Sequence, residues 1–201
     1  MNIKYTPTFE ELADELRPQL TAYLKRMTGN DTDAADLLQE TLIRIADALP
    51  RFEGRSSAKN WVFRIATNVA IDFLRRSKRV VLETFDEDSD ISEIEEEDRL
   101  ILDEMNSCVR EVIDNLPADY RAATVLFHLH SRTVAEIAEI LDISVSLVKV
   151  RIHRGKKLLK ESLNRQCTFY TGPDGNIRCD RKLVGIDDEM PRSASRPPKK
   201  L

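Results

Sequence analysis

Residues 133–157 read TVAEIAEILDISVSLVKVRIHRGKK, and this stretch decides the fold class. Glu136 follows Thr133 at the spacing of a capping box, which predicts that a short helix begins there. Asp142-Ile143 predicts a tight turn, and Ser144 predicts the N-cap of a longer helix. A short helix, a turn of a few residues and a longer basic helix make a helix-turn-helix, whose second helix can enter the major groove of DNA.

The longer helix separates its apolar residues from its basic ones. The residues predicted to pack inward are Val145, Val148, Ile152 and Leu159. The residues predicted to point outward are mostly polar or basic: Ser146, Lys149, Val150, His153, Arg154, Lys156 and Lys157. Because capping, turn length, core spacing and outward charge agree, we predict that this module binds DNA.

The composition of the whole chain indicates its fold class. The 201 residues are 41% hydrophobic and 33% charged, which is typical of a soluble globular protein of one or two small domains. Glycine is scarce, with 6 residues, and aromatic residues make up only 6%. Leu, Ile, Ala, Glu, Arg and Lys are abundant and favour helices over sheets, so an all-α protein is predicted.

Charge is segregated along the chain, although the net charge is only −4. Residues 55–79 and residues 149–165 each hold seven basic residues against one acidic residue, a local charge of +6. Between them, residues 83–98 hold ten acidic residues and no basic residue, which predicts an extended, flexible linker. The predicted organisation is a first module at 9–80, an acidic linker at 81–99, a second module at 100–165 and a tail at 166–201.

The first module is predicted to contain three helices. They cover Phe9–Thr28, interrupted near Pro18, then Asp33–Leu49, ended by Pro50, and Ala58–Arg76 after a Ser N-cap. The last helix carries two stripes of equal spacing. One is an apolar core stripe of Val62, Ala66, Val69 and Phe73, and the other is a mostly basic row of Arg64, Asn68, Ile71 and Arg75. Taken alone, the basic row is either a solvated face or a nucleic-acid surface.

The second module is predicted to begin with two further helices, at Asp103–Asn115 and Ala118–His130, separated by Leu116-Pro117. After Leu163, Gly and Pro become frequent, which predicts a small hairpin followed by disorder. Cys167 and Cys179 flank the hairpin turn. Two separate thiols are the favoured interpretation in a reducing cytosol, and a disulfide or a shared metal is the alternative.

Several classes of protein are excluded by missing patterns. No phosphate-binding loop, HExxH or GxSxG motif occurs, and the three histidines have no spacing with Cys or carboxylates that defines a metal or nucleophile site, so neither an enzyme nor a cofactor is predicted. The N-terminus has no apolar run typical of a signal peptide, and no segment has the apolar length of a membrane span. A cytoplasmic protein without membrane insertion is therefore expected.

Two separate segments resemble the bacterial RNA polymerase sigma factors. Residues 36–42 (DLLQETL), 51–57 (RFEGRSS) and 61–76 (WVFRIATNVAIDFLRR) are similar to the second conserved region of that family. Residues 116–121 (LPADYR) and 135–155 (AEIAEILDISVSLVKVRIHRG) are similar to its fourth region. With only these two regions and a short linker, the chain resembles the extracytoplasmic-function (ECF) group of the sigma-70 family.

The resemblance implies roles for the first module. It implies that a face with Asp36, Gln39 and Glu40 docks on the clamp helices of the polymerase largest subunit; an ordinary solvated acidic face is the alternative. It also implies that the loop at 52–57 and the following helix open the minus-ten element and hold a flipped base of the non-template strand. The residues suited to that task are Arg55, Lys59, Arg64, Asn68, Arg75 and Arg76. Trp61 is either a stacking platform or, as we favour, a core residue.

For the second module, the resemblance implies reading of the minus-thirty-five element. The matching residues are Ser144, Ser146, Lys149, Val150, Arg151, His153, Arg154 and Lys157. Arg154 is the best candidate for a bidentate contact to guanine, and Ser144, Lys156 and Lys157 are candidates for phosphate contacts. The sequence departs from the family pattern at Asp142, where Gly is common, and at Val150, where a small polar residue is common.

The expected function is therefore that of a transcription initiation factor. Its implied partners are core RNA polymerase, through the clamp helices and the flap, promoter DNA, and an anti-sigma factor. The alternative is a helix-turn-helix regulator that acts without polymerase, which would leave residues 36–42 and the first basic block unexplained. We also expect the acidic linker to fold back and screen the basic faces, so that the chain alone binds promoter DNA weakly.

Overall fold

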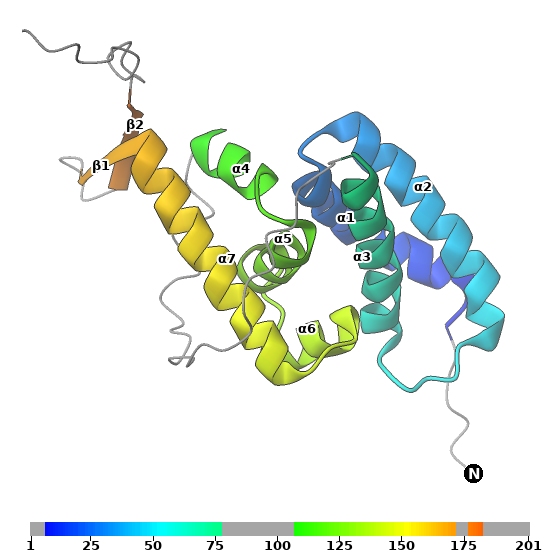
Figure 1. Ribbon diagram of the computed structural model, residues 1–201. Helices are drawn as coiled ribbons and strands as arrows, with labels where there is room; N and C mark the ends of the chain where they lie inside the picture. The colour runs from blue at the N-terminus through cyan, green and yellow to red at the C-terminus, as the bar shows by residue number, and fades with distance from the viewer. Residues whose placement is uncertain (1–6, 78–106, 172–176, 183–201) are drawn as a thin grey trace, which may run out of the picture.

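The computed structural model describes residues 7–77, 107–171 and 177–182, and these residues form helices followed by a short antiparallel pair of strands. The predicted acidic linker at 81–99 and the tail beyond residue 182 lie outside the described residues. Within the described residues, the first module contains α1 to α3 and the second contains α4 to α7 (Figure 1). The predicted all-α class is confirmed.

The first module is a bundle of three long helices. They are α1 (Phe9–Thr28), α2 (Asp31–Ala48) and α3 (Ala58–Ser77), with the short 3₁₀ helix η1 (Leu49–Arg51) between α2 and α3. The prediction of an interruption near Pro18 is wrong, because α1 continues through that residue. Pro18 and Asp14 are both exposed, so water can satisfy the Asp14 carbonyl that Pro18 cannot bind.

The second module consists of shorter helices that lead into one long helix. These are α4 (Ser107–Asp114), α5 (Ala118–Thr124), the π-helical turn η3 (Val125–Leu129), α6 (Val134–Leu141) and α7 (Val145–Gln166). The predicted helix at 118–130 is thus an α-helix that changes to π geometry at residue 125. In this turn the amide of His130 donates to the carbonyl of Val125, five residues earlier.

The helix-turn-helix forms as the sequence predicts. Thr133 and Glu136 make a reciprocal capping box at the start of α6, and the side chain of Ser144 caps α7. Asp142 ends α6 in the left-handed conformation, with φ 56°, which a short polar side chain tolerates. The predicted inward position of Val145 is wrong: this side chain is 47% exposed, because it is the first residue of α7 and lies at the end of the packed segment.

The C-terminal strands are β1 (Cys167–Thr171) and β2 (Ile177–Arg181), which pair antiparallel. The register places Cys167 opposite Arg181 and Cys179 opposite Phe169. The two cysteines are therefore offset by two residues along the paired strands. Cys167 is buried.

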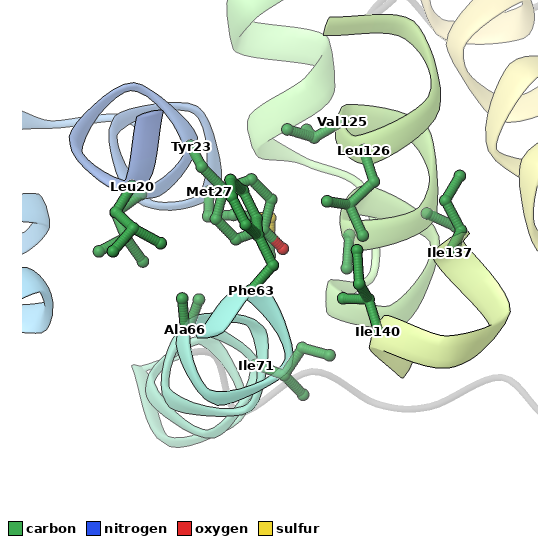
Figure 2. Packing of buried hydrophobic residues seen from close by; sticks show 14 of the residues in the cluster. Leu20, Tyr23, Met27, Phe63, Ala66, Ile71, Val125, Leu126, Ile137 and Ile140 are labelled. Carbon is green, nitrogen blue, oxygen red and sulfur yellow. The ribbon is translucent and has the colours of Figure 1, made fainter. Parts of the chain in front are cut away.

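One continuous hydrophobic core joins the two modules. Helix α3 contacts both α5 and α6, and α1 contacts η3. Figure 2 shows Tyr23, Met27 and Phe63 of the first module facing Leu126 and Ile140 of the second, and all five are buried. The helix-turn-helix is thus packed directly on the first module through apolar side chains. Burial of apolar surface is the main favourable contribution to the stability of such a contact.

A buried arginine crosses this inter-module contact. Arg121 of α5 is only 1% exposed, and its guanidinium donates to the carbonyl of Met27 in the last turn of α1. Its Nη1 also lies 3.3 Å from Oδ1 of Asp114. Burial lowers the pKa of Arg121, and the charge of Asp114 opposes that shift. Because the last carbonyls of a helix have no partner within the helix, Arg121 acts as a cap that the second module supplies to the first.

His130 fills a second position in this contact. Its ring lies edge-on to Tyr23 and Phe63, with centroid distances of 5.4 and 6.0 Å, and the guanidinium of Arg132 lies 4.6 Å above the Phe63 ring. Burial, together with the nearby charges of Arg132 and Arg26, lowers the pKa of His130 to about 4. The neutral imidazole is therefore the form that packs here.

We expect His130→Phe to weaken the acid dependence of stability. Wild-type His130 stays neutral in the folded state down to a pKa of about 4 but takes up a proton below its ordinary pKa of 6.5 when unfolded. Its contribution to the free energy of unfolding is thus present above pH 6.5 and is lost as the pH falls toward 4. Urea unfolding at several pH values should show a slope shallower by up to about 1.4 kcal/mol per pH unit in the variant. Identical slopes for both proteins would contradict the assignment.

Candidate nucleic-acid interface

The predicted recognition face of α7 is available at the surface. Ser146, Lys149, His153 and Lys157 are exposed along this helix, and Ser144 is exposed at its cap. Val150, Arg151 and Arg154 are half-buried beside them. The structure therefore brings all eight residues predicted to meet the minus-thirty-five element onto one helix and its cap, and their roles as DNA contacts stay predictions.

Arg151 differs from its neighbours because it is bound within the protein. Its Nη1 lies 3.2 Å from Oδ1 of Asp119, at the start of α5, and its side chain is 20% exposed. The other carboxylate oxygen of Asp119 lies 2.9 Å from Nη2 of Arg75 on α3. One carboxylate thus holds one arginine from each of the two predicted DNA-binding surfaces. The sequence does not predict this role of Asp119, because nothing in its local pattern indicates partners 32 and 44 residues away.

A glycine sets the distance between α7 and α5. Gly155 is buried on α7, and a Cβ atom at this position would lie 2.3 Å from Oγ1 of Thr124. Because only glycine permits so close an approach, it fixes how far the recognition face stands out from the rest of the module.

The basic row of α3 does not face solvent as a whole. Arg64 forms an ion pair with Asp142, Arg75 pairs with Asp119, and Ile71 between them is buried against the second module. Asn68 is exposed at the edge of the row. The structure therefore places part of the predicted minus-ten surface in the inter-module contact.

The remaining predicted minus-ten residues lie around the two ends of α3. Arg55 is exposed in the preceding loop and pairs with Glu53, Lys59 is half-buried in the first turn, and Arg76 is exposed in the last. Trp61 is half-buried at the margin of the core, and its ring centroid lies 4.9 Å from that of Phe52. The Trp61 ring is thus packed as a core residue, which is the interpretation favoured from the sequence.

The predicted polymerase-binding face lies on α2, away from the second module (Figure 1). Asp36 and Gln39 are exposed, and Glu40 is half-buried and pairs with Arg44 at 2.6 Å. Ile43 lies on the same face one helical turn beyond Gln39 and is 63% exposed, the highest value among the large apolar side chains of the described residues. The sequence could have identified Ile43, because it is an apolar residue outside the core stripe of its helix.

A depression adjoins this face. Its lining residues come from α2 and the end of α3: Asp33, Asp36, Leu37, Glu40, Phe73, Arg76 and Ser77. In the part of the chain that the structure describes, no cluster of three or more His, Cys, Asp or Glu residues could hold a metal ion. Nor does any helix there combine the length and apolar character of a membrane-spanning segment.

A helical bundle joined to a helix-turn-helix with a basic, exposed face is typical of a two-module DNA-binding protein. The comparisons with known proteins then give the family. The Sigma-70 region 2 family matches residues 12–80, and the Sigma-70, region 4 family matches residues 106–159. The chain belongs to the ECF group of sigma-70 factors.

Curated relatives are similar over most of the chain. The ECF RNA polymerase sigma factor SigX of Bacillus subtilis is 34% identical over 165 residues, which cover 78% of this chain and 84% of that protein. The corresponding SigE of Mycolicibacterium smegmatis is 31% identical over 160 residues, which cover 78% of this chain and 62% of that protein.

Solved structures share the fold. A structure of CnrH in complex with the cytosolic domain of CnrY matches with a TM-score of 0.57 and 25% identity, covering 78% of this chain and 88% of that one. RpoE of Bartonella quintana, solved with the anti-sigma factor NepR, matches with a TM-score of 0.57 and 22% identity, covering 78% and 96%. The second likeness supports the fold alone.

We expect Gly155→Ala to destabilise the protein. The new methyl group would overlap Thr124 Oγ1, and such overpacking costs about 1–3 kcal/mol, more than the about 1 kcal/mol that Ala gains over Gly in a helix. Thermal unfolding should show the loss. The double variant Thr124→Ala with Gly155→Ala removes the overlapping oxygen and should recover most of it, and absence of recovery would contradict the packing argument.

Proposed function

We propose that this chain directs core RNA polymerase to promoters by using its two surfaces together. The exposed face of α2, with Asp36, Gln39 and Ile43, binds the clamp helices of the largest subunit, and the second module binds the flap. Helix α3 and its preceding loop open and hold the minus-ten element, and the exposed face of α7 reads the minus-thirty-five element.

One observation supports this proposal: the two modules carry two separate exposed faces, one on α2 with an apolar residue among polar ones and one on α7 that is basic. The α2 face combines two exposed polar residues with the exposed Ile43, a combination typical of a protein interface that has an apolar centre and a polar rim. The α7 face combines Lys149, Lys157 and His153 on one exposed side of a helix. A regulator that acts without polymerase would need only the α7 face.

The place of action follows from these partners. A factor that works on polymerase and promoter DNA acts in the bacterial cytoplasm, without a catalytic step and without a cofactor of its own. An anti-sigma factor is a further proposed partner, because the sigma factor RpoE of Bartonella quintana has this fold and was solved with one.

Polymerase dependence separates this function from the alternative regulator. Purified chain should be retained by immobilised core polymerase and should allow that polymerase to start transcription at a specific promoter. Promoter binding should require the polymerase. Tight, sequence-specific binding of a promoter duplex by the chain alone at physiological salt, with no retention on core polymerase, would favour the simple regulator.

Ile43→Asp should weaken binding to core polymerase at least tenfold. A charge at the centre of an apolar contact loses its water without gaining a partner, so the complex is weakened. The free protein loses little stability, because Ile43 is already 63% exposed. Ala22→Asp is the matched control, since it adds the same charge at an exposed position of α1, outside the α2 face. Equal affinities of the two variants for polymerase would show that Ile43 lies outside the interface.

Arg154→Ala and Lys157→Ala should act differently on promoter choice. Loss of a bidentate contact to guanine should cost about 1–3 kcal/mol and relax the preference at one base, whereas loss of a phosphate contact should weaken all sequences about equally. Transcription from a library of upstream elements measures both. A uniform decrease for Arg154→Ala would refute base reading by this residue.

A further inference from the structure

A cavity lies where the corner between α1 and α2 meets α4. Its volume is about 410 Å³, within the range of sites that bind small molecules. The charged side chains that line it are Lys25, Arg26 and Asp31 of the first module and Arg110 and Asp114 of the second. None of the residues assigned above to polymerase or promoter DNA lines this cavity.

Both carboxylates at the cavity are already paired with a cation. Oδ1 of Asp31 lies 3.1 Å from Nζ of Lys25, and Oδ1 of Asp114 lies 3.3 Å from Nη1 of the buried Arg121. Lys25 and Arg121 each provide the one positive charge that balances one carboxylate. The two carboxylates therefore leave the other cations of the cavity unbalanced.

Arg26 and Arg110 are these remaining cations. Neither guanidinium forms an ion pair with any residue that the structure describes. Arg26 is half-buried, Arg110 is exposed, and they belong to different modules. Two positive charges at one cavity repel each other, and an anion between them replaces this repulsion by attraction. The charge of the cavity thus favours a negatively charged ligand.

The backbone around the cavity also favours an anion. Asn30 caps α2 and Asp31 is its first residue, so the positive end of this helix lies at the cavity. The end of α1 has the opposite polarity, but Arg121 donates a hydrogen bond to the carbonyl of Met27 there. This bond occupies a carbonyl group that would otherwise repel an anion.

A close backbone contact fixes the two sides of the cavity relative to each other. Gly29 adopts φ 81° at the corner, and a Cβ atom at this position would lie 2.6 Å from Oδ2 of Asp114. Only glycine permits this approach, so α4 lies directly against the corner. Arg110 is on α4 one helical turn before Asp114, and it is therefore held beside the first module.

We propose that this cavity binds a small molecule that carries a phosphate group, through Arg26 and Arg110. A guanidinium offers phosphate oxygens two parallel N–H donors, and two guanidinium groups balance the charge of about −2 on a phosphate monoester. Because the two arginines belong to different modules, the ligand bridges α1 and α4 and stabilises their packing. The site involves neither polymerase nor DNA, so this inference goes beyond the proposed function.

Isothermal titration calorimetry of the full chain with pyrophosphate, at constant ionic strength, tests the site. The parent should bind one equivalent. Arg26→Gln with Arg110→Gln should weaken binding at least tenfold, because charge-assisted hydrogen bonds are lost. The matched control is Arg17→Gln with Arg165→Gln, which removes the same two charges at exposed positions outside the cavity and should keep the parental affinity.

Two outcomes of the titration would overturn the proposal. One is an equal loss of affinity in the two double variants, which would indicate binding by general electrostatic attraction to the basic chain. The other is the absence of saturable binding by the parent below about 10 mM pyrophosphate. The measurements use the chain alone, so neither outcome affects the proposed function.

A single variant keeps the test decisive if the double variant does not fold. Arg110 is exposed, so Arg110→Glu should fold, and it places a carboxylate where the phosphate is proposed to bind. Pyrophosphate should raise the thermal unfolding midpoint of the parent and of the control Arg165→Glu but not that of Arg110→Glu. An equal rise in Arg110→Glu would overturn the proposal.

Hydrogen exchange tests whether the ligand bridges the modules. Pyrophosphate should slow amide exchange in the last turn of α1 and in α4 of the parent, and in neither segment of Arg110→Glu. Slower exchange in only one of the two helices would show that the ligand does not connect them.

Discussion

The arrangement of the two modules depends on satisfying one buried guanidinium. A charged group inside a protein has to find acceptors, and Arg121 finds the carboxylate of Asp114 in its own module and the carbonyl of Met27 in the other. Met27 lies in the last turn of α1, where carbonyls lack partners within the helix. Moving the modules past each other would leave the charge without that acceptor. The apolar core makes the contact stable, and Arg121 restricts it to one register.

The two predicted DNA surfaces are coupled through α5. This short helix supplies Asp119 to both Arg75 and Arg151, supplies Arg121 to α1, and packs against Gly155 of the recognition helix. A displacement of α5 would therefore act on the position of α7 and on the charge available along α3 together. The α2 face lies outside this network, since α2 contacts α1, α3 and η1.

The sequence predicted features that depend on neighbours along the chain. The capping box of Thr133 and Glu136 and the cap at Ser144 were identified because their partners lie three residues away. The predicted interruption of α1 at Pro18 was wrong, because the free energy cost of a missing hydrogen bond depends on access to water, which only the fold determines. Asp119 was missed because its arginines are distant in sequence. The charge blocks revealed two basic surfaces, but their partial neutralisation within the chain required knowledge of how the modules pack.

The π-helical turn at η3 has a consequence for how such a contact can arise. A helix that gains one residue in a single turn shifts every following side chain by about 100° around its axis relative to an uninterrupted α-helix. His130 closes this turn, and its ring contacts the rings of Tyr23 and Phe63. A chain with one residue fewer in η3 would therefore carry the residue that ends the helix about 100° away from both rings.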